Sequence, residues 1–189
     1  MQELRNGLIL YHGSYYEVRE PDLERCNARK DFGKGFYLTS SKEQAESFLK
    51  TSIAKAITKG DADADQDYGF ISVFKFDMTN ELYSYLFETA DFNWLHCIAA
   101  HRKRKLFDVI EKEMAAYDVI AGKIADDQTN TTLTAYIGGA FGQIGSKEAD
   151  EFCIKQLLPD KLKDQYCFKT EKAIGCLTFV ESEKVWIRK

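Results

Sequence analysis

The sequence predicts an α+β fold in one domain spanning residues 1–189. Hydrophobic residues make up 44% of the 189-residue chain and aromatic residues 13%, which is enough to build a globular core. Short apolar runs rich in β-branched and aromatic residues indicate strands, and longer runs with helical spacing indicate helices. Because the two kinds of segment do not alternate regularly, we do not expect a doubly wound parallel sheet. The chain shows no internal repeat.

The first third of the chain predicts two strands and a helix. Residues 8–12 form an apolar run that predicts a buried strand, and residues 36–39 predict a second strand. The segment between them, 13–35, has few apolar anchors, and a loop of that length in a compact domain is usually functional. Ser41 and Gln44 have capping-box spacing and mark the start of a helix. Its core face is expected to carry Ala45, Phe48, Leu49, Ile53, Ala56 and Ile57.

An acidic segment, residues 60–67, then predicts a solvated linker. It is not a calcium loop, because Gln66 stands where the turn needs glycine and Ser72 where the loop needs glutamate. Residues 70–77 predict a clear strand, and residues 82–87 predict another short one.

The middle of the chain predicts a helix capped by Asp91 that ends in the basic run 101–105. Cations suit a helix C-terminus, and a phosphate-contacting patch is the functional alternative. Residues 117–122 predict a strand. The carboxylates of 125–127 either cap the following helix, which is predicted from Thr129 to Phe141, or orient a ligand.

The last third predicts a helix that opens at Ser146 and stops before Pro159. Residues 165–170 predict a strand whose alternation places Gln165 and Cys167 on one face. A short turn or helix follows at 171–176. The final strands are predicted at 177–180 and 184–187.

Composition narrows the classes of function. The net charge is −4, which argues against a general nucleic-acid-binding domain. We expect a cytoplasmic protein without membrane contact, because no apolar run approaches membrane-spanning length. The five cysteines are scattered and odd in number, so we expect reduced thiols. The three histidines are dispersed, so we expect no metal site.

Two stretches carry the candidate functional residues. Residues 8–14, LILYHGS, form an apolar strand that ends in His12, Gly13 and Ser14. Residues 31–39, DFGKGFYLT, place Gly33 and Gly35 before an aromatic strand. Glycines allow positive φ or a close approach of backbone to ligand, although the same run also fits a hairpin corner with a core tyrosine.

Together these stretches resemble the ADP-ribosyltransferase superfamily, in the branch typified by poly(ADP-ribose) polymerases and diphtheria toxin. The whole chain is similar to a bacterial domain family of unknown function placed in that superfamily. The features that carry the likeness are Tyr11–Ser14, Pro21–Leu23, Asp31–Thr39, Ala125–Asp127 and Gln165–Ala173. The resemblance implies split antiparallel β-sheets with flanking helices, and NAD as the substrate.

The resemblance also implies roles for single residues. His12 would bond the adenosine-side ribose as a hydrogen-bond donor, Gly13 would pair its backbone with the nicotinamide amide, and Tyr37 would stack on the nicotinamide ring. The remaining expected NAD-contacting residues are Ser14, Asp31, Gly33, Gly35 and Thr39.

The third motif of the superfamily is normally a glutamate, and Gln165 falls in its place. Glutamine can bond a ribose hydroxyl but cannot oppose the positive charge that develops in the reaction. Glu171 is the next candidate carboxylate, and Asp127 a more remote one.

Three hypotheses follow from this pattern. The first is an NAD-dependent mono-ADP-ribosyltransferase that modifies a protein or nucleic-acid acceptor without a metal. The second is a catalytically weak or inactive module that binds NAD or ADP-ribose. The third is an unrelated α+β interaction domain.

Overall fold

The protein is a mixed α+β structure built on one open sheet. The computed structural model describes residues 3–125, 127–158 and 162–187. The strands are β1 (Leu8–Ser14), β2 (Phe36–Thr39), β3 (Tyr68–Phe76), β4 (Ser84–Leu86), β5 (Val119–Lys123), β6 (Asp164–Phe168) and β7 (Leu177–Trp186). The helices are α1 (Lys42–Lys59), α2 (Phe92–Arg102), α3 (Asp108–Met114), α4 (Asp127–Ile137), α5 (Lys147–Leu157) and α6 (Glu171–Ile174), with a 3-10 turn at Leu23–Arg25.

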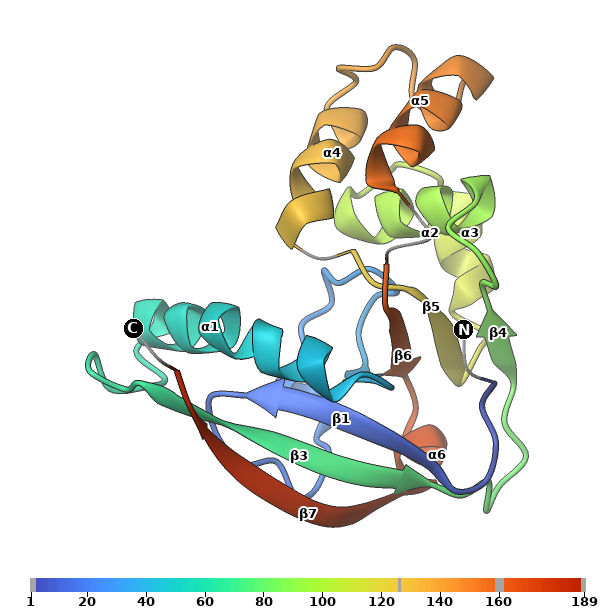
Figure 1. The fold of residues 1–189 in the computed structure, drawn as a ribbon. Helices are drawn as coiled ribbons and strands as arrows, with labels where there is room; N and C mark the ends of the chain where they lie inside the picture. The colour runs from blue at the N-terminus through green and yellow to red at the C-terminus, as the bar shows by residue number, and fades with distance from the viewer. Residues whose placement is uncertain (1–2, 126, 159–161, 188–189) are drawn as a thin grey trace.

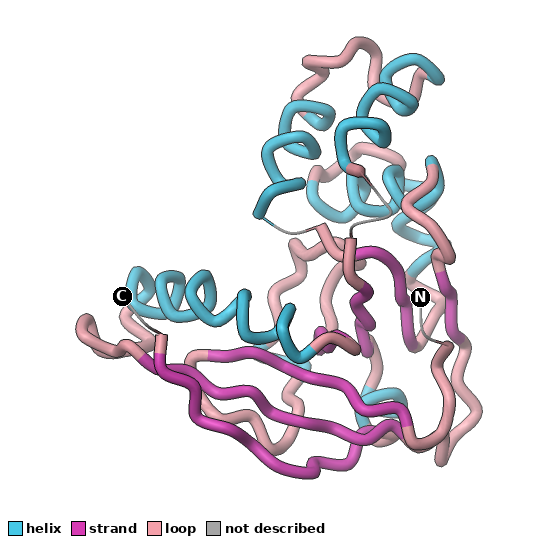
Figure 2. The backbone as a smooth tube through the Cα atoms, in the orientation of Figure 1, coloured by secondary structure: helices cyan, strands magenta, loops and turns pink. Residues whose placement is uncertain are grey.

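The seven strands of the sheet follow the order β4-β5-β6-β2-β1-β3-β7. The β4–β5 pair is parallel, and the other neighbours are antiparallel. Figure 1 shows the sheet turning sharply near its middle, so that β1, β3 and β7 form one wing and β4, β5 and β6 another. The tube in Figure 2 follows the same two groups of strands. The turn lies where β2 passes from one wing to the other.

Helix α1 covers one face of the β1–β3–β7 wing (Figure 1). Ala45 and Leu49 of α1 pack on Ile71 of β3 in a small buried cluster. The predicted cap is confirmed, because the Ser41 side chain accepts a hydrogen bond from the Gln44 amide at 3.3 Å. The helix ends at Gly60, whose φ of 79° suits a left-handed C-cap.

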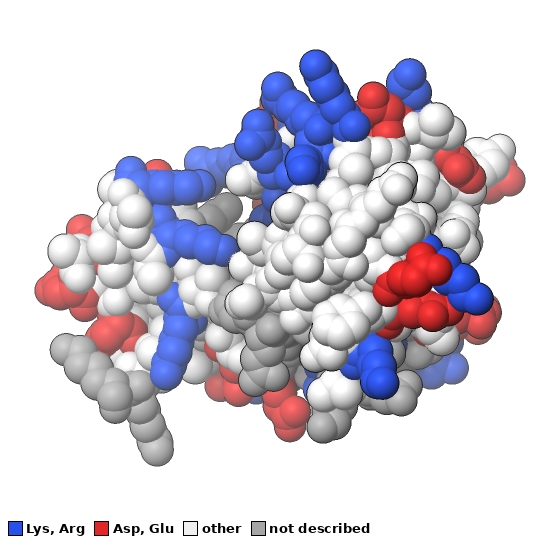
Figure 3. Space-filling model, turned by 90° about the horizontal axis from the view of Figure 1, so that it is seen from above, with Lys and Arg blue, Asp and Glu red and all other residues white. Residues whose placement is uncertain are grey.

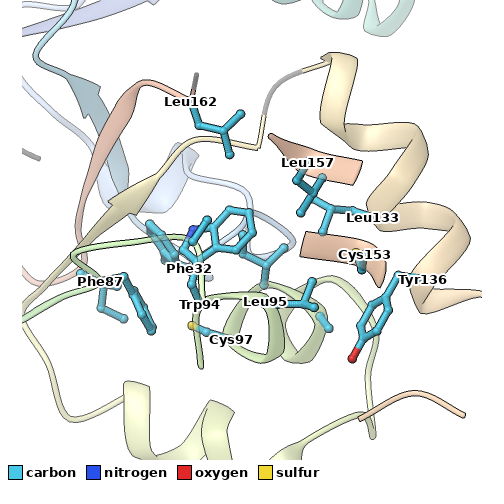
Figure 4. Close-up of a cluster of buried hydrophobic side chains, with 14 of the residues drawn as sticks. Phe32, Phe87, Trp94, Leu95, Cys97, Leu133, Tyr136, Cys153, Leu157 and Leu162 are labelled. Carbon is cyan, nitrogen blue, oxygen red and sulfur yellow. The ribbon is translucent and has the colours of Figure 1, made fainter. Parts of the chain in front are cut away.

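A second region, which we call the helical lobe, consists of α2, α3, α4 and α5 above the β4–β5–β6 wing (Figure 1). Its core is built on Trp94 and Leu95 of α2, with Phe32, Leu133, Tyr136 and Cys153 among the surrounding side chains (Figure 4). The predicted cap Asp91 accepts from the Trp94 amide at 3.0 Å, and Ser146 caps α5 in the same way. The apolar residues of α2 therefore anchor this lobe to the sheet.

The opposite face of the central strands forms a third buried cluster. Leu10, Leu38, Phe74 and Phe168 lie in it, together with Ala173 of α6. The predicted alternation of β6 is confirmed, because Cys167 packs in the core of the helical lobe and Phe168 in this cluster.

Several predictions about the elements were wrong. The two strands predicted at 177–180 and 184–187 are one strand, β7, with a bulge at Val180, since Phe179 pairs with Phe74 and Glu181 with Val73. Helix α3 was not expected. Helix α4 starts at Asp127 instead of Thr129, and it stops at Ile137 because Gly139 adopts a φ of 79°, so residues 138–141 do not continue it.

All five cysteines are free thiols, as expected. No helix in the described ranges is both long enough and apolar enough to cross a bilayer.

Candidate functional site

The sheet opens between β1 and β2, and the predicted site lies at this opening. The two strands are aligned at Tyr11 and Thr39, where the regular pairing stops. β1 continues beside β3 as far as Ser14, which pairs with Phe70. The turn of β1 away from β2 frees the adjoining edges of both strands, which in a regular sheet would bond to each other.

His12 fills the gap at the start of this opening. Its Nδ1 lies 2.8 Å from the carbonyl oxygen of Tyr37, and its ring centroid lies 4.5 Å from that of Phe36. A carbonyl oxygen can only accept, so Nδ1 carries the hydrogen. Burial lowers the pKa of His12 to about 4, although the bond to Tyr37 opposes this shift and Lys30 adds to it. The imidazole is therefore neutral near pH 7, and Nε2 is left as an acceptor. The sequence had suggested a donor.

Tyr37 is fixed by the loop that precedes it. Its hydroxyl donates to the Gly33 carbonyl at 2.8 Å and accepts from the Phe32 amide at 2.9 Å. Burial raises the pKa of Tyr37 well above its usual range, and Cys167 and Asp31 add to the shift. The phenol therefore stays protonated, and its ring, which is partly buried, is the surface that a ligand could meet.

The glycines of both motifs are required by packing. An added Cβ at Gly13 would lie 2.2 Å from the Ala45 carbonyl oxygen of α1. At Gly35 it would lie 2.5 Å from the sulfur of Cys167, and at Gly33, where φ is 83°, 2.8 Å from His101. These contacts account for the three glycines without a ligand.

Gln165 is buried on β6, opposite Thr39 of β2 and on the same face as Tyr37. Its Nε2 donates to Asp31 Oδ2 at 2.9 Å and to the Lys123 carbonyl at 3.2 Å. The side chain of Thr39 is used locally, since its hydroxyl donates to the Asp164 carbonyl at 2.8 Å. Gln165 thus presents an amide whose orientation is fixed, with a carboxylate beside it.

That carboxylate, Asp31, is the centre of a buried polar network. Arg102, in the last turn of α2, donates to Asp31 Oδ1 from Nε at 2.9 Å and from Nη2 at 2.6 Å. The same guanidinium reaches Asn130 of α4 at 2.9 Å through Nη1. Asp31 is 7% exposed, so its charge is balanced by Arg102 inside the protein.

The structure therefore brings together His12, Asp31, Tyr37, Thr39 and Gln165, with Gly33 and Gly35 in the adjoining loop. Glu171 is not part of this group, because it is exposed at the start of α6, beyond the far end of β6. The side chain of Asp127 lies outside the described residues.

One face of the molecule has a hollow with basic side chains around it. Figure 3 shows Lys and Arg side chains around a hollow between the part of the molecule that contains α1 and the helical lobe. Two other surface hollows are lined by residues that include Trp186 and Ile187, and Asn6 and Ser40. Neither is lined by His12, Tyr37 or Gln165. Among the residues in the described ranges, no group of three or more His, Cys, Asp or Glu could hold a metal ion.

The model of a family described as "Protein of unknown function (DUF3990)" matches residues 8–179. The chain belongs to the DUF3990 family. The match begins with β1 and extends into β7, so it includes every strand that borders the opening. Among curated proteins, none matches this DUF3990 chain.

Sequence reasoning missed two members of the DUF3990 site. Arg102 was assigned to the basic end of α2, where it does lie, but its ion pair with Asp31 joins residues 71 positions apart and has no local signal. Lys30 was not singled out, although its Nζ lies 5.9 Å from the centroid of the Tyr37 ring. Lys30 and Asp31 are adjacent in a long loop, and no local sequence pattern predicts that one lies near the Tyr37 ring and the other pairs with Arg102.

Proposed function

We propose that this DUF3990 protein is an NAD-dependent mono-ADP-ribosyltransferase that acts on a protein or nucleic-acid acceptor. The observation that carries the proposal is the opening between β1 and β2. His12 of β1 borders it on one side and Tyr37 of β2 on the other, and Gln165 lies on the next strand, β6. The motif order, and a fold compatible with split antiparallel sheets, support the same assignment.

The proposed reaction breaks the bond between the nicotinamide nitrogen and ribose C1′ of NAD. The bonding electron pair leaves with nicotinamide, and a nucleophile of the acceptor bonds to C1′ and gives up its proton. Tyr37 offers the ring on which nicotinamide stacks. His12 Nε2 accepts a hydrogen bond from a ribose hydroxyl, because the carbonyl of Tyr37 already holds the Nδ1 hydrogen.

In this proposal, Gln165 and Asp31 together perform the role of the glutamate that the superfamily normally has in its third motif. The amide positions a ribose hydroxyl, while the Asp31 carboxylate, 2.9 Å from the amide nitrogen, supplies negative charge near the developing cation. Arg102 offsets much of that charge, so we expect slow transfer.

The second candidate is a module that binds NAD or ADP-ribose without turnover. One observation favours it: the nitrogen of Gln165 is already bonded to Asp31 and to the Lys123 carbonyl. In that case the site would hold the dinucleotide and lack the free carboxylate that transfer needs.

Incubation with NAD labelled in the adenosine part, together with cell extract, separates the two candidates. A transferase leaves label on a macromolecule, whereas a binding module raises the melting temperature with NAD and leaves none. Tyr37→Ala should abolish both signals by removing the stacking ring. Tyr83→Ala is the matched control, because that tyrosine is exposed and outside the opening. A signal that survives Tyr37→Ala would refute the site.

A further inference from the structure

Three lysines gather beside the opening. Lys30, in the loop before β2, lies with its Nζ 5.4 Å from the centroid of the Phe48 ring of α1. Lys55, two turns further along α1, lies with its Nζ 6.0 Å from the same centroid. Lys59 ends the helix and is close enough to affect the charge of Lys30.

Lys30 is unusual because it is partly buried and has no acceptor. Among the described residues it makes no hydrogen bond or ion pair, and its Nζ contacts only the faces of Tyr37 and Phe48. The other recessed lysines are satisfied: Lys123 bonds Asp164 at 2.9 Å, and Lys169 bonds the Met114 carbonyl at 2.6 Å. An ammonium group with no protein acceptor, held against two aromatic faces, is free to form charge-assisted hydrogen bonds with a bound anion.

The nearest carboxylate does not supply that anion. Asp31 follows Lys30 in sequence, but its two oxygens are bonded to Arg102 and to Gln165. Burial lowers the pKa of Lys30, and the charge of Lys55 lowers it further, with a smaller contribution from Lys59, whereas Asp31 and Cys26 raise it. The charges of Lys55 and Lys59 therefore repel that of Lys30, in a protein whose net charge is −4. An anion placed between them would turn this repulsion into attraction.

We propose that Lys30, Lys55 and Lys59 form a binding site for a diphosphate group, and that this group is the diphosphate of the dinucleotide. The second half of the proposal rests on the proposed function. Lysine ammonium groups bind phosphate oxygens as point charges. Lys30 also acts on His12 and Tyr37, so the diphosphate would lie directly beside the ribose and nicotinamide positions.

A small diphosphate explains the cluster better than a nucleic-acid strand does. Lys30 is partly buried, whereas Lys55 and Lys59 are exposed, so the three lysines do not form one row of exposed cations. A strand would instead require a row of exposed cations along its backbone. The site should therefore distinguish NAD and ADP from nicotinamide by their phosphates.

Calorimetric titration with inorganic pyrophosphate and with ADP tests the site directly. Wild type should bind both, and Lys30→Gln should weaken binding by about tenfold or more, because a charge-assisted hydrogen bond is lost. Lys55→Gln and Lys59→Gln should weaken binding severalfold. Lys50→Gln, which removes an exposed lysine of the same helix, should behave as wild type. Added salt should weaken wild type more than Lys30→Gln.

Three results would overturn the proposal: no binding of pyrophosphate or ADP to wild type, equal binding by wild type and Lys30→Gln, or equal weakening by Lys50→Gln. Lysine-dependent binding of a single-stranded oligonucleotide without binding of ADP would assign the cluster to nucleic acid instead. Circular dichroism of each variant excludes unfolding as the cause.

The failure of this inference and the failure of the proposed function give different results. If pyrophosphate binding depends on Lys30 but no label is transferred from NAD and NAD binds no better than pyrophosphate, the diphosphate site stands and the proposed function falls. If label is transferred and the KM for NAD is unchanged in Lys30→Gln, the function stands and the diphosphate site falls.

Discussion

Two buried aspartates, one at the opening of the sheet and one in the helical lobe, use different kinds of partner. Asp31 is 7% exposed and is paired with the guanidinium of Arg102. Asp150 of α5 is 2% exposed; it lies 2.6 Å from His96 Nε2 and accepts a hydrogen bond from the Tyr136 hydroxyl. Each carboxylate is fully engaged, but only Asp31 has a partner with a permanent charge.

The difference shows what each network joins. The Asp150 network connects α2, α4 and α5, which all belong to the helical lobe. The Asp31 network connects a loop, the end of α2 and strand β6, so it ties the helical lobe to the sheet at the candidate site. A change at Asp31 should therefore affect stability and ligand binding together, whereas a change at Asp150 should affect stability alone.

Removing the two carboxylates is the most severe test of this comparison. Asp31→Ala leaves the partly buried Arg102 guanidinium with its bond to Asn130 but without its charged partner, and we expect a loss of about 3–5 kcal/mol in the free energy of unfolding. Asp150→Ala leaves two donors without an acceptor, and we expect about 1–3 kcal/mol. Urea unfolding followed by fluorescence measures both. A larger loss for Asp150→Ala, or NAD binding that survives Asp31→Ala, would break the comparison.

His12, at the opening, should contribute to the pH dependence of stability. The pKa of His12 falls from 6.5 to about 4 on folding, so between these values the unfolded chain binds a proton that the folded protein does not. Stability must then decrease as the pH falls through this window, by up to about 3 kcal/mol. His12→Gln should flatten this part of the profile. Midpoints of urea unfolding, measured from about pH 4 to pH 6.5 for wild type and variant, test this prediction.

Gln165→Glu sharpens the comparison by placing a second carboxyl group at the Asp31 network. The new group would stand where an amide nitrogen now lies 2.9 Å from Asp31, so its pKa should be raised. A raised carboxyl pKa means that stability is lost as pH rises above about 4.3, and we expect a deficit of about 1–3 kcal/mol at neutral pH. Gln165→Met, which carries no charge, should show no such pH dependence. Stability that rises with pH in Gln165→Glu would contradict this account.

The smallest losses of stability are expected when the hydroxyl groups of two tyrosines are removed. Tyr37→Phe removes the bonds to Gly33 and Phe32, and Tyr136→Phe removes those to Asp150 and Gly145. Each should cost about 1–2 kcal/mol in thermal unfolding. Tyr37→Phe keeps the aromatic ring and should retain NAD binding, unlike Tyr37→Ala. If binding were lost with the hydroxyl, stacking would not be the role of this residue.

Local signals in the sequence predicted much of the fold. Ser41, Asp91 and Ser146 cap the helices that they were expected to cap, because a cap depends on a side chain and an amide three residues away. Helix α3 was missed for the same reason: Phe107 precedes it in a left-handed conformation, with no capping side chain.

The candidate site was predictable only in part. His12, Tyr37 and Gln165 could be placed on strands because alternation and glycine turns are local patterns. The Asp31–Arg102 pair and the two bonds of Gln165 could not, since they join segments between 42 and 134 residues apart. Such contacts follow from the packing of α2 and β6 around the loop, which no short window of sequence records.

The position of β6 in the sheet also constrains synthesis on the ribosome. This strand, at residues 164–168, lies between β2 and β5, which are made much earlier. Until it emerges, the edges of both neighbours stay uncovered in the nascent chain, and such edges invite pairing with other molecules. We therefore expect a product that stops short of β6 to be prone to aggregate.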